Sequence, residues 1–328
     1  MIPPRFVRRL ALIPLLVVLT AVAVAVGTPV LLLGLVVSRG RRRVARVTVI
    51  VVSWLVMECV VLCAALALWP ARGDAETVRE RHYALCAWFL GRMYGVGSRA
   101  LALTIEVQEP LNASSDRPVI VLSRHAGPGD SFLIVHFLLN VYGRRPRIVM
   151  KAALRLDPAV DVVLGRLPNV FVTGNEEPGG RPVAEIERLA AGLEGRDALL
   201  IFPEGGNFTP RRRVRAIRSL RRRGRRAAAE RARAMPNVLP PRATGTLTAL
   251  AAAPHADVVF VAHTGADDLL SPSDVWRNIP MDQPLRARWW RIPHEEIPAE
   301  HRERWLFDWW ETIDAWVAEN RPEGREQG

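Results

Sequence analysis

Two long apolar stretches open the chain. Residues 10–37 carry no charge, and residues 47–69 carry only Glu58. Each stretch exceeds the roughly 20 residues that a helix needs to cross a bilayer core. The pattern therefore predicts a membrane-associated hairpin over residues 1–70 and a separate domain over residues 71–328. A cleaved signal peptide is the alternative for the first stretch, but that stretch is long for one and a second follows it directly.

The path of this hairpin through the membrane is a further prediction. Pro14 and the Gly-Thr-Pro sequence at 27–29 indicate that the first segment bends or re-enters. The loop at 38–46 is rich in arginine, and we expect both this loop and the following domain on the cytoplasmic side of the cell membrane. One segment should then be re-entrant or confined to one leaflet. Glu58 should face the partner segment or be protonated.

From about residue 100 onward, short apolar runs alternate with stretches of helical periodicity. The runs of strand length are residues 102–107, 118–123, 147–151, 169–173, 198–203 and 257–264. The helical stretches are residues 75–98, 130–142, 180–194, 212–235 and 244–253. This alternation predicts an α/β domain in which helices flank a mostly buried sheet.

The last periodic segment is rich in tryptophan. Residues 301–320 place six apolar side chains on one helical face, namely Trp305, Leu306, Trp309, Ile313, Trp316 and Val317. We expect this stripe to pack on the core. A membrane-interface helix is the alternative, because tryptophan favours the headgroup level of a bilayer.

Charge and cysteine content narrow the possible partners. The net charge is +12, and residues 211–226 hold ten arginines without an acidic residue. This run favours anionic lipid headgroups or a solvated face over nucleic acid, because interleaved aromatics, zinc-ligand spacing and known docking motifs are missing. Three cysteines, two of them inside an apolar segment, form neither a disulfide framework nor a zinc site. We expect no metal and no cofactor.

The first candidate for chemistry is the sequence VLSRHAGPGDSF at residues 121–132. His125 and Asp130 stand five residues apart, so they meet only if the backbone between them turns. Gly-Pro-Gly at 127–129 is suited to such a turn, and Asp130 then lies in the first turn of a helix. Such a pair could act as a general base, with a substrate hydroxyl as nucleophile, because the chain has no G-x-S-x-G sequence. An ordinary helix cap is the alternative.

A second candidate follows the apolar run at 198–203. Pro-Glu-Gly-Gly, which includes Glu204, Gly205 and Gly206, stands at the C-terminal end of that expected strand. Ligands of open α/β folds bind at this edge of the sheet, and consecutive backbone N–H groups there suit a phosphate or an oxyanion. A tight turn with a solvated glutamate is the alternative.

Together, these motifs resemble those of the glycerolipid acyltransferases. His-x4-Asp at 125–130, Phe-Pro-Glu-Gly at 202–205 and the sequence NVLPPRATGTLTAL at 237–250 are similar to the blocks of the 1-acylglycerol-3-phosphate (lysophosphatidic acid) acyltransferases. The resemblance covers roughly residues 85–265. It implies a glycerol-3-phosphate acyltransferase-like mixed sheet. It also implies transfer of a fatty acyl group from acyl-CoA or acyl carrier protein to the free hydroxyl of a lysophospholipid, with lysophosphatidate as acceptor and phosphatidate as product.

The resemblance also implies roles for particular residues. His125 would deprotonate the acceptor hydroxyl and Asp130 would orient it, while Glu204, Gly205 and Gly206 would contribute to acceptor binding. The family has a basic residue near Lys151, the only lysine in the chain. A lysine at this one position suggests that a flexible point charge is needed to meet phosphate.

Three departures from the family pattern bear on the acceptor. Arg124 stands where the family often has asparagine, and Asn207 follows Gly206 where the family has Thr-Arg. The expected arginine near residue 174 is also replaced. Arg242 is our candidate to replace the phosphate-binding arginines that the family has at these positions, with Arg211 and Arg212 as alternatives.

Two other function classes remain open from the sequence. A lipid hydrolase or thioesterase could use the same His-Asp pair to activate water. A catalytically silent membrane scaffold is the second alternative.

Overall fold

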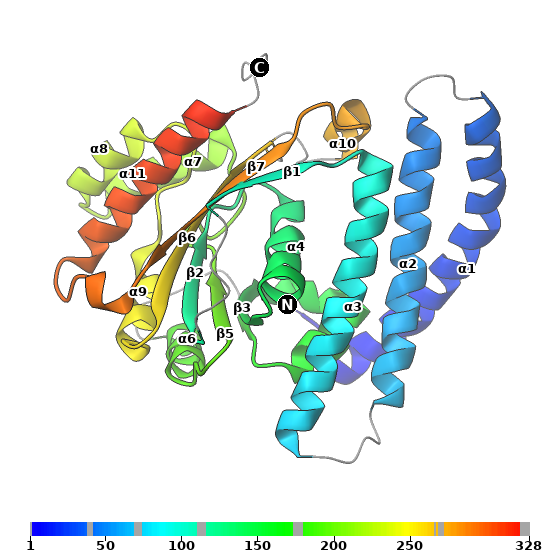
Figure 1. The fold of residues 1–328 in the computed structure, drawn as a ribbon, viewed down its shortest axis with the longest axis horizontal. Coiled ribbons are helices and arrows are strands. Elements are labelled where there is room, and N and C mark those ends of the chain that lie inside the picture. Colours follow the sequence, from blue (N-terminus) through cyan, green and yellow to red (C-terminus); the bar gives the residue numbers. More distant parts are fainter. Residues whose placement is uncertain are drawn as a thin grey trace.

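The computed structural model describes residues 2–37, 42–68, 74–109, 116–172, 180–265, 267 and 272–321. It has an α/β domain beside a layer of long N-terminal helices (Figure 1). The boundary proposed near residue 70 lies outside the described residues.

The domain is built on a seven-stranded sheet in the order β1-β7-β6-β2-β5-β3-β4. Neighbouring strands are parallel except β6 and β7, which are antiparallel, so the sheet is mixed. The strands are β1 (Ile105–Gln108), β2 (Val119–Ser123), β3 (Arg145–Lys151), β4 (Val170–Val172), β5 (Asp197–Ile201), β6 (Asp257–Thr264) and β7 (Leu285–Ile292). The expected α/β mixed sheet is confirmed, although β7 was not predicted.

Helices cover both faces of the sheet. The helices of the domain are α4 (Pro128–His136), α5 (Pro158–Val163), α6 (Arg181–Ala191), α7 (Pro210–Arg222), α8 (Arg226–Ala234), α9 (Ala243–Ala252), α10 (Pro272–Asn278) and α11 (Arg302–Asn320). A π-helical turn, Phe137–Val141, extends α4, and the 3-10 turns are Ala152–Leu156, Leu164–Arg166 and His294–Glu296.

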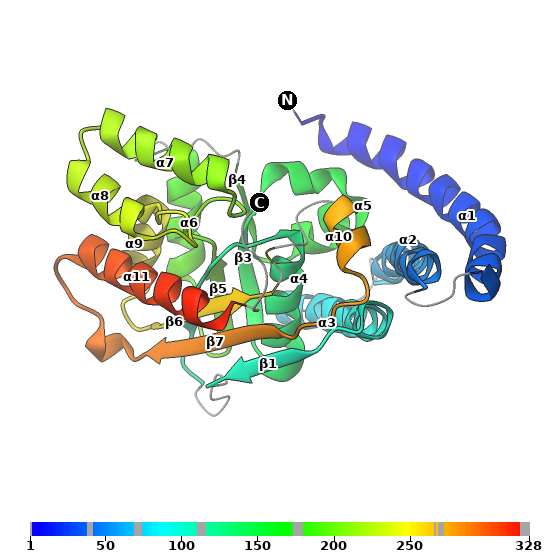
Figure 2. The same cartoon turned by 90° about the horizontal axis from the view of Figure 1, so that it is seen from above.

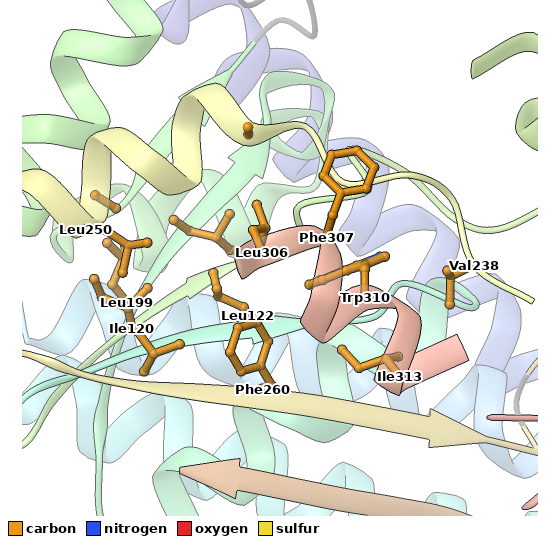
Figure 3. Close-up of a cluster of buried hydrophobic side chains, with 14 of the residues drawn as sticks. Ile120, Leu122, Leu199, Val238, Leu250, Phe260, Leu306, Phe307, Trp310 and Ile313 are labelled. Carbon is orange, nitrogen blue, oxygen red and sulfur yellow. The ribbon is translucent and has the colours of Figure 1, made fainter. Parts of the chain in front are cut away.

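Alternation along β2 shows how the two cores divide. Ile120 and Leu122 point to the core under α6, α9 and α11, whereas Val119 and Val121 point to the core under α4. All four side chains are fully buried. Figure 3 shows the first of these cores, where Phe260 of β6 lies beside Trp310 of α11. A strand covered on both faces reads as a continuous apolar run, which explains why β2 was easy to predict.

The C-terminal helix α11 packs on the sheet, as expected. Leu306, Trp310 and Ile313 are fully buried, and Trp309 stacks on Phe260 with a ring-centroid distance of 4.6 Å. The predicted tryptophan stripe is therefore core packing. Phe307 and Trp310, which the predicted stripe did not include, are also buried, whereas Trp305 and Trp309 are only partly buried.

The arginine-rich segment forms two helices instead of the one predicted over 212–235. Helix α7 begins after Thr209, whose hydroxyl accepts a hydrogen bond from the Arg212 N–H, and ends at Arg222. Gly224 then adopts a left-handed conformation with φ of 74°, which reverses the chain into α8. This glycine, hidden in an otherwise continuous arginine run, ends the helix.

The N-terminal layer consists of α1 (Arg5–Val37), α2 (Arg43–Ala67) and α3 (Ala75–Leu101). Helices α1 and α2 are long and apolar enough to cross a membrane, with mean hydropathies of 2.7 and 2.6 in their most apolar windows. Many of their large apolar side chains are exposed, among them Leu10, Val18, Leu33 and Leu66. Such side chains are typical of a surface that contacts lipid.

Helix α1 continues through Pro14 and Pro29, so the Gly-Thr-Pro sequence at 27–29 does not interrupt it. A Cβ atom on Gly27 would lie 2.7 Å from a methyl group of Val52. Gly27 therefore allows α1 and α2 to approach closely, as small residues do between membrane helices. Whether either helix re-enters the membrane stays a prediction.

Arginine side chains hold these helices to the domain. Arg8 and Arg9 of α1 pair with Asp161 of α5, with N–O distances of 2.5 and 2.7 Å. Arg43 donates to the carbonyl oxygen of Ile279, and Arg46 donates to that of Ala100. Two arginines expected to face lipid headgroups thus contact the protein instead. Residues 38–41 of that loop lie outside the described residues.

Candidate active site

The loop between β2 and α4 brings His125 and Asp130 together. The His125 Nδ1 atom lies 3.1 and 3.2 Å from the two carboxylate oxygens of Asp130. Asp130 also accepts hydrogen bonds from the backbone N–H groups of Gly127 and Ser131. Helix α4 starts at Pro128, so Asp130 lies in its first turn, as the sequence predicted. The same carboxylate caps the helix and orients the imidazole, so the two alternatives posed by the sequence coexist.

The charge of Asp130 is stabilised despite its burial. Burial alone would raise the pKa of this carboxyl, but hydrogen bonds from His125 and Gly127 and the nearby His263 outweigh it and hold the pKa below its usual value. A carboxylate that stays ionised keeps the proton of His125 on Nδ1 and leaves Nε2 free to accept one. His125 also packs on Phe202, with ring centroids 4.4 Å apart. The geometry suits a general base.

Glu204 lies beneath this loop and does not line the cavity. Its carboxylate accepts hydrogen bonds from the backbone N–H groups of His125 and Leu239, each at 3.1 Å, and the residue is 2% exposed. Burial raises the pKa of Glu204 to about 8, although the nearby Arg124 charge and these hydrogen bonds counter it. Glu204 thus braces the backbone of His125. Because Glu204 is buried and does not line the cavity, nothing in this geometry supports the predicted contact between its side chain and an acceptor.

Arg124, the departure from the family pattern, serves as a buried anchor. Its guanidinium donates to the carbonyl oxygens of His263 and Asn237 and pairs with Asp267. The side chain is fully buried and therefore unable to reach a substrate from outside. Arg124 ties the end of β2 to the end of β6. Sequence reasoning missed these partners because each lies more than 100 residues from Arg124.

A cluster of three cations surrounds Gly205 and Gly206. The Arg242 guanidinium lies over Gly205, while the Arg212 guanidinium and the Lys151 ammonium lie next to Gly206. Partial burial lowers the pKa of Lys151, and the charges of Arg212 and Arg242 lower it further. Three mutually repelling cations around one turn have the charge and the donor groups that an anion such as phosphate requires. The structure thus brings the predicted Lys151 and Arg242 together with Arg212, while Arg211 is exposed on α7.

The same residues open into a large cavity of about 590 Å³. His125, Lys151 and Arg242 line one part of it. Apolar side chains of α2, α3 and α5 line the rest, including Val61, Leu90 and Val163. This volume is within the range of about 300–1,000 Å³ found for small-molecule sites. The cavity joins the His-Asp pair, the cation cluster and the N-terminal helices.

Glu58 also lines this cavity. Its carboxylate accepts a hydrogen bond from the indole N–H of Trp54, one turn earlier on α2. The residue is 5% exposed and faces the cavity shared with the domain. Its side chain therefore faces this cavity and not the partner segment α1, where we expected it.

One group of possible metal ligands occurs among the described residues. Asp257, His294 and Glu295 bring ligand atoms within 4.8 Å of one another. Asp257 is already paired with Arg291, and Glu295 with Arg117. Asp257 begins β6, at the edge opposite the end that carries His263, so this group lies away from the cavity. The group therefore takes no part in chemistry at His125.

Comparisons with known proteins agree with this geometry. A family model described as Acyltransferase matches residues 104–244, which include His125, Asp130 and Glu204. The crystal structure of the 1-acyl-sn-glycerophosphate (LPA) acyltransferase PlsC from Thermotoga maritima has a TM-score of 0.54 to this chain at 18% identity. That match covers 84% of this chain and 94% of the PlsC chain, so the fold is shared. No curated protein matches. The resemblance inferred from the motifs is confirmed by these matches over the part of the chain that the family model covers.

Proposed function

We propose that this protein transfers a fatty acyl group from a thioester donor to the free hydroxyl of lysophosphatidate, giving phosphatidate. One observation carries the proposal. His125, whose Nδ1 atom contacts Asp130, lies at the wall of a cavity that also contacts Lys151 and Arg242 and extends between apolar helices. A base, a phosphate site and an apolar channel are the three features that this acceptor and a fatty acyl donor require.

The reaction would begin at His125. Its Nε2 atom takes the proton of the acceptor hydroxyl while that oxygen attacks the thioester carbonyl carbon. Asp130 stabilises the imidazolium that forms, as the carboxylate does in other His-Asp pairs. The carbon–sulfur bond then breaks, the imidazolium returns its proton to the departing thiolate, and an ester remains on the lipid. No covalent enzyme intermediate is needed.

The cation cluster would position the acceptor. Lys151, Arg212 and Arg242 supply donors for the phosphate, each charge-assisted bond contributing about 1.5–3 kcal/mol. Bound there, the phosphate holds the glycerol near His125, which lines the same cavity. Such positioning converts a bimolecular step into one within a bound complex.

The apolar part of the cavity would hold the acyl chain. Its walls include residues of α2, so the N-terminal layer contributes to the site as well as to membrane association. We propose that α1 and α2 hold the enzyme on the cell membrane with the domain on the cytoplasmic side, where the lipid acceptor and a soluble donor meet. Acyl-CoA and acyl carrier protein both fit this scheme as donors.

A substrate panel tests the function. Purified protein is given a long-chain acyl-CoA, or the same acyl group on acyl carrier protein, with lysophosphatidate, lysophosphatidylcholine or no acceptor. We expect phosphatidate with lysophosphatidate and much less product with the choline acceptor. Release of thiol without acceptor, at the rate seen with it, would instead identify a thioesterase. A protein that binds membranes but uses neither donor would be a scaffold.

A further inference from the structure

The outer face of α7 carries a straight row of arginines. Arg211, Arg215, Arg218 and Arg222 follow one another at intervals of four, three and four residues, which places them on one face of the helix. All four are exposed. The opposite face is the buried one, centred on Ile217. The row is about 16 Å long at the rise of an α-helix.

These four arginines have no hydrogen-bond or ion-pair partner among the described residues. Their neighbours differ from them in this respect. Arg213 donates to the carbonyl oxygens of Met235 and Arg233, and Arg221 pairs with Glu230. Intramolecular contacts therefore involve Arg213 and Arg221, which lie outside the row, and leave the row available to an external anionic surface.

Apolar side chains are exposed beside this row. Val214, on the flank of the same face, is 44% exposed. Leu154 and Leu156, in the turn that follows Lys151, are each 47% exposed. Arg212 and Lys151 meet at Gly206, so α7 and this turn begin at the same point of the active site. Exposed leucine and valine beside arginine is the composition of a surface that enters the headgroup region of a bilayer.

The position of this surface agrees with a membrane partner. Figure 2 shows α7, the segment leading into α5 and the first turns of α1 along one side of the molecule. Arg8 and Arg9 of α1 are bound to Asp161 of α5, so the apolar N-terminal helix is fixed next to that segment. Phe6 and Leu10 are exposed on these first turns.

We infer that the arginine row of α7, with Val214, Leu154 and Leu156, is a second membrane-docking surface that binds anionic phospholipid headgroups beside the active-site entrance. This surface acts in addition to α1 and α2, and it does not depend on the acyl-transfer chemistry. An anionic bilayer is favoured over a soluble acidic protein because apolar side chains accompany the charges and because the surface continues toward the apolar helix α1.

A fluorescent label at Val214 tests the inference without requiring turnover. The full chain carries Val214→Cys, with Cys59→Ser and Cys63→Ser, while the buried Cys86 stays in place. An environment-sensitive dye on residue 214 is measured with vesicles whose headgroups carry a nitroxide quencher. The vesicles contain either phosphatidylcholine alone or about 30% phosphatidylglycerol, and flotation measures the bound protein.

We expect strong quenching with anionic vesicles and weak quenching with neutral ones, at equal amounts of bound protein. The triple variant R215Q/R218Q/R222Q should lose the quenching, since each arginine near an anionic surface is worth about a fivefold change in binding. The control R188Q/R196Q/R304Q removes the same charge from exposed positions elsewhere and should retain it.

Two results would overturn the inference. An unquenched label on protein that floats with anionic vesicles would mean that the row is only solvated. A spectral shift produced by acyl carrier protein alone, together with no quenching by vesicles, would assign the row to an acidic protein. Failure of acyl transfer changes neither readout, so the two proposals fail separately.

Discussion

The guanidinium of Arg242 lies over Gly205, so that a Cβ atom at residue 205 would be 2.8 Å from its Cζ atom. Gly205 also has a φ of 69°, in the left-handed region that other residues enter at a cost of about 1–2 kcal/mol. Two independent features therefore disfavour a side chain at this position. A side chain at residue 205 would displace Arg242 from the anion site that we propose.

Gly205→Ala should displace Arg242 and weaken acceptor binding. We expect KM for lysophosphatidate to rise about tenfold, with a loss of stability of about 1–2 kcal/mol from the strained backbone. Steady-state kinetics and thermal unfolding measure both effects. Gly165→Ala is the matched control, because its added Cβ meets no atom within 4 Å. Equal kinetics for the two variants would show that Arg242 does not bind the acceptor.

Lys151→Ala should raise KM selectively for phosphate-bearing acceptors. Loss of a charge-assisted contact of about 1.5–3 kcal/mol corresponds to an increase of about 10–100-fold. Monoacylglycerol, which lacks the phosphate, should be used no worse by the variant than by the unmodified protein. A uniform loss on both acceptors would place Lys151 outside the phosphate site.

Val61→Phe should shorten the acyl chain that the enzyme accepts. Val61 of α2 is buried and lines the apolar part of the cavity. A larger side chain fills part of the about 590 Å³ or costs about 1–3 kcal/mol of strain. Competition between donors of different chain length should then favour shorter chains by several carbons. Val60→Phe, at an exposed neighbour, should leave the preference unchanged.

Glu204 should make stability dependent on pH in a defined window. Its folded-state pKa of about 8 exceeds the ordinary value of 4.5, so the folded state binds the proton more tightly than the unfolded state does. The contribution of Glu204 to stability is then fully present below about pH 4.5, decreases as pH rises toward 8, and is constant above it. The difference in melting temperature between the unmodified protein and Glu204→Gln should fall across this window.

The control for this pH series is Glu187→Gln, which changes an exposed carboxyl. That variant should follow the unmodified protein at every pH. A difference between the unmodified protein and Glu204→Gln that stays constant from pH 5 to pH 8 would contradict a raised pKa of Glu204.

The sequence predicted those parts of the fold that depend on residues close together in the chain. The buried strand β2 reads as an apolar run, and Gly-Pro-Gly with Asp130 forms the turn and first helical turn that the motif indicated. Strand β7 was not predicted because its sequence, LRARWWRI, mixes three arginines with apolar residues, and most of its side chains are only partly buried. Its pairing with β6 and β1 is set by tertiary contact.

In the candidate site, too, contacts between residues close in sequence were predicted and contacts between distant segments were not. His125 and Asp130 were found because they are five residues apart, so the contact between them is local in sequence. Glu204 was identified as chemically important, but its partners, the backbone N–H groups of His125 and Leu239, come from distant segments. The position of Glu204 beneath the His125 loop could not be inferred from the spacing of motifs in the sequence. The cavity wall contributed by α2 could not be predicted either, because an apolar membrane-type helix gives no sign of which face meets the domain.

The most direct test of the central claim is acyl transfer to lysophosphatidate by His125→Ala and Asp130→Asn, with membrane association measured on the same preparations. Both variants should float with vesicles like the unmodified protein. His125→Ala should lose about 10²–10⁴-fold in kcat, and Asp130→Asn should approach it, because the amide no longer holds the imidazole in the basic tautomer. Transfer at the unmodified rate by folded His125→Ala protein would contradict the account.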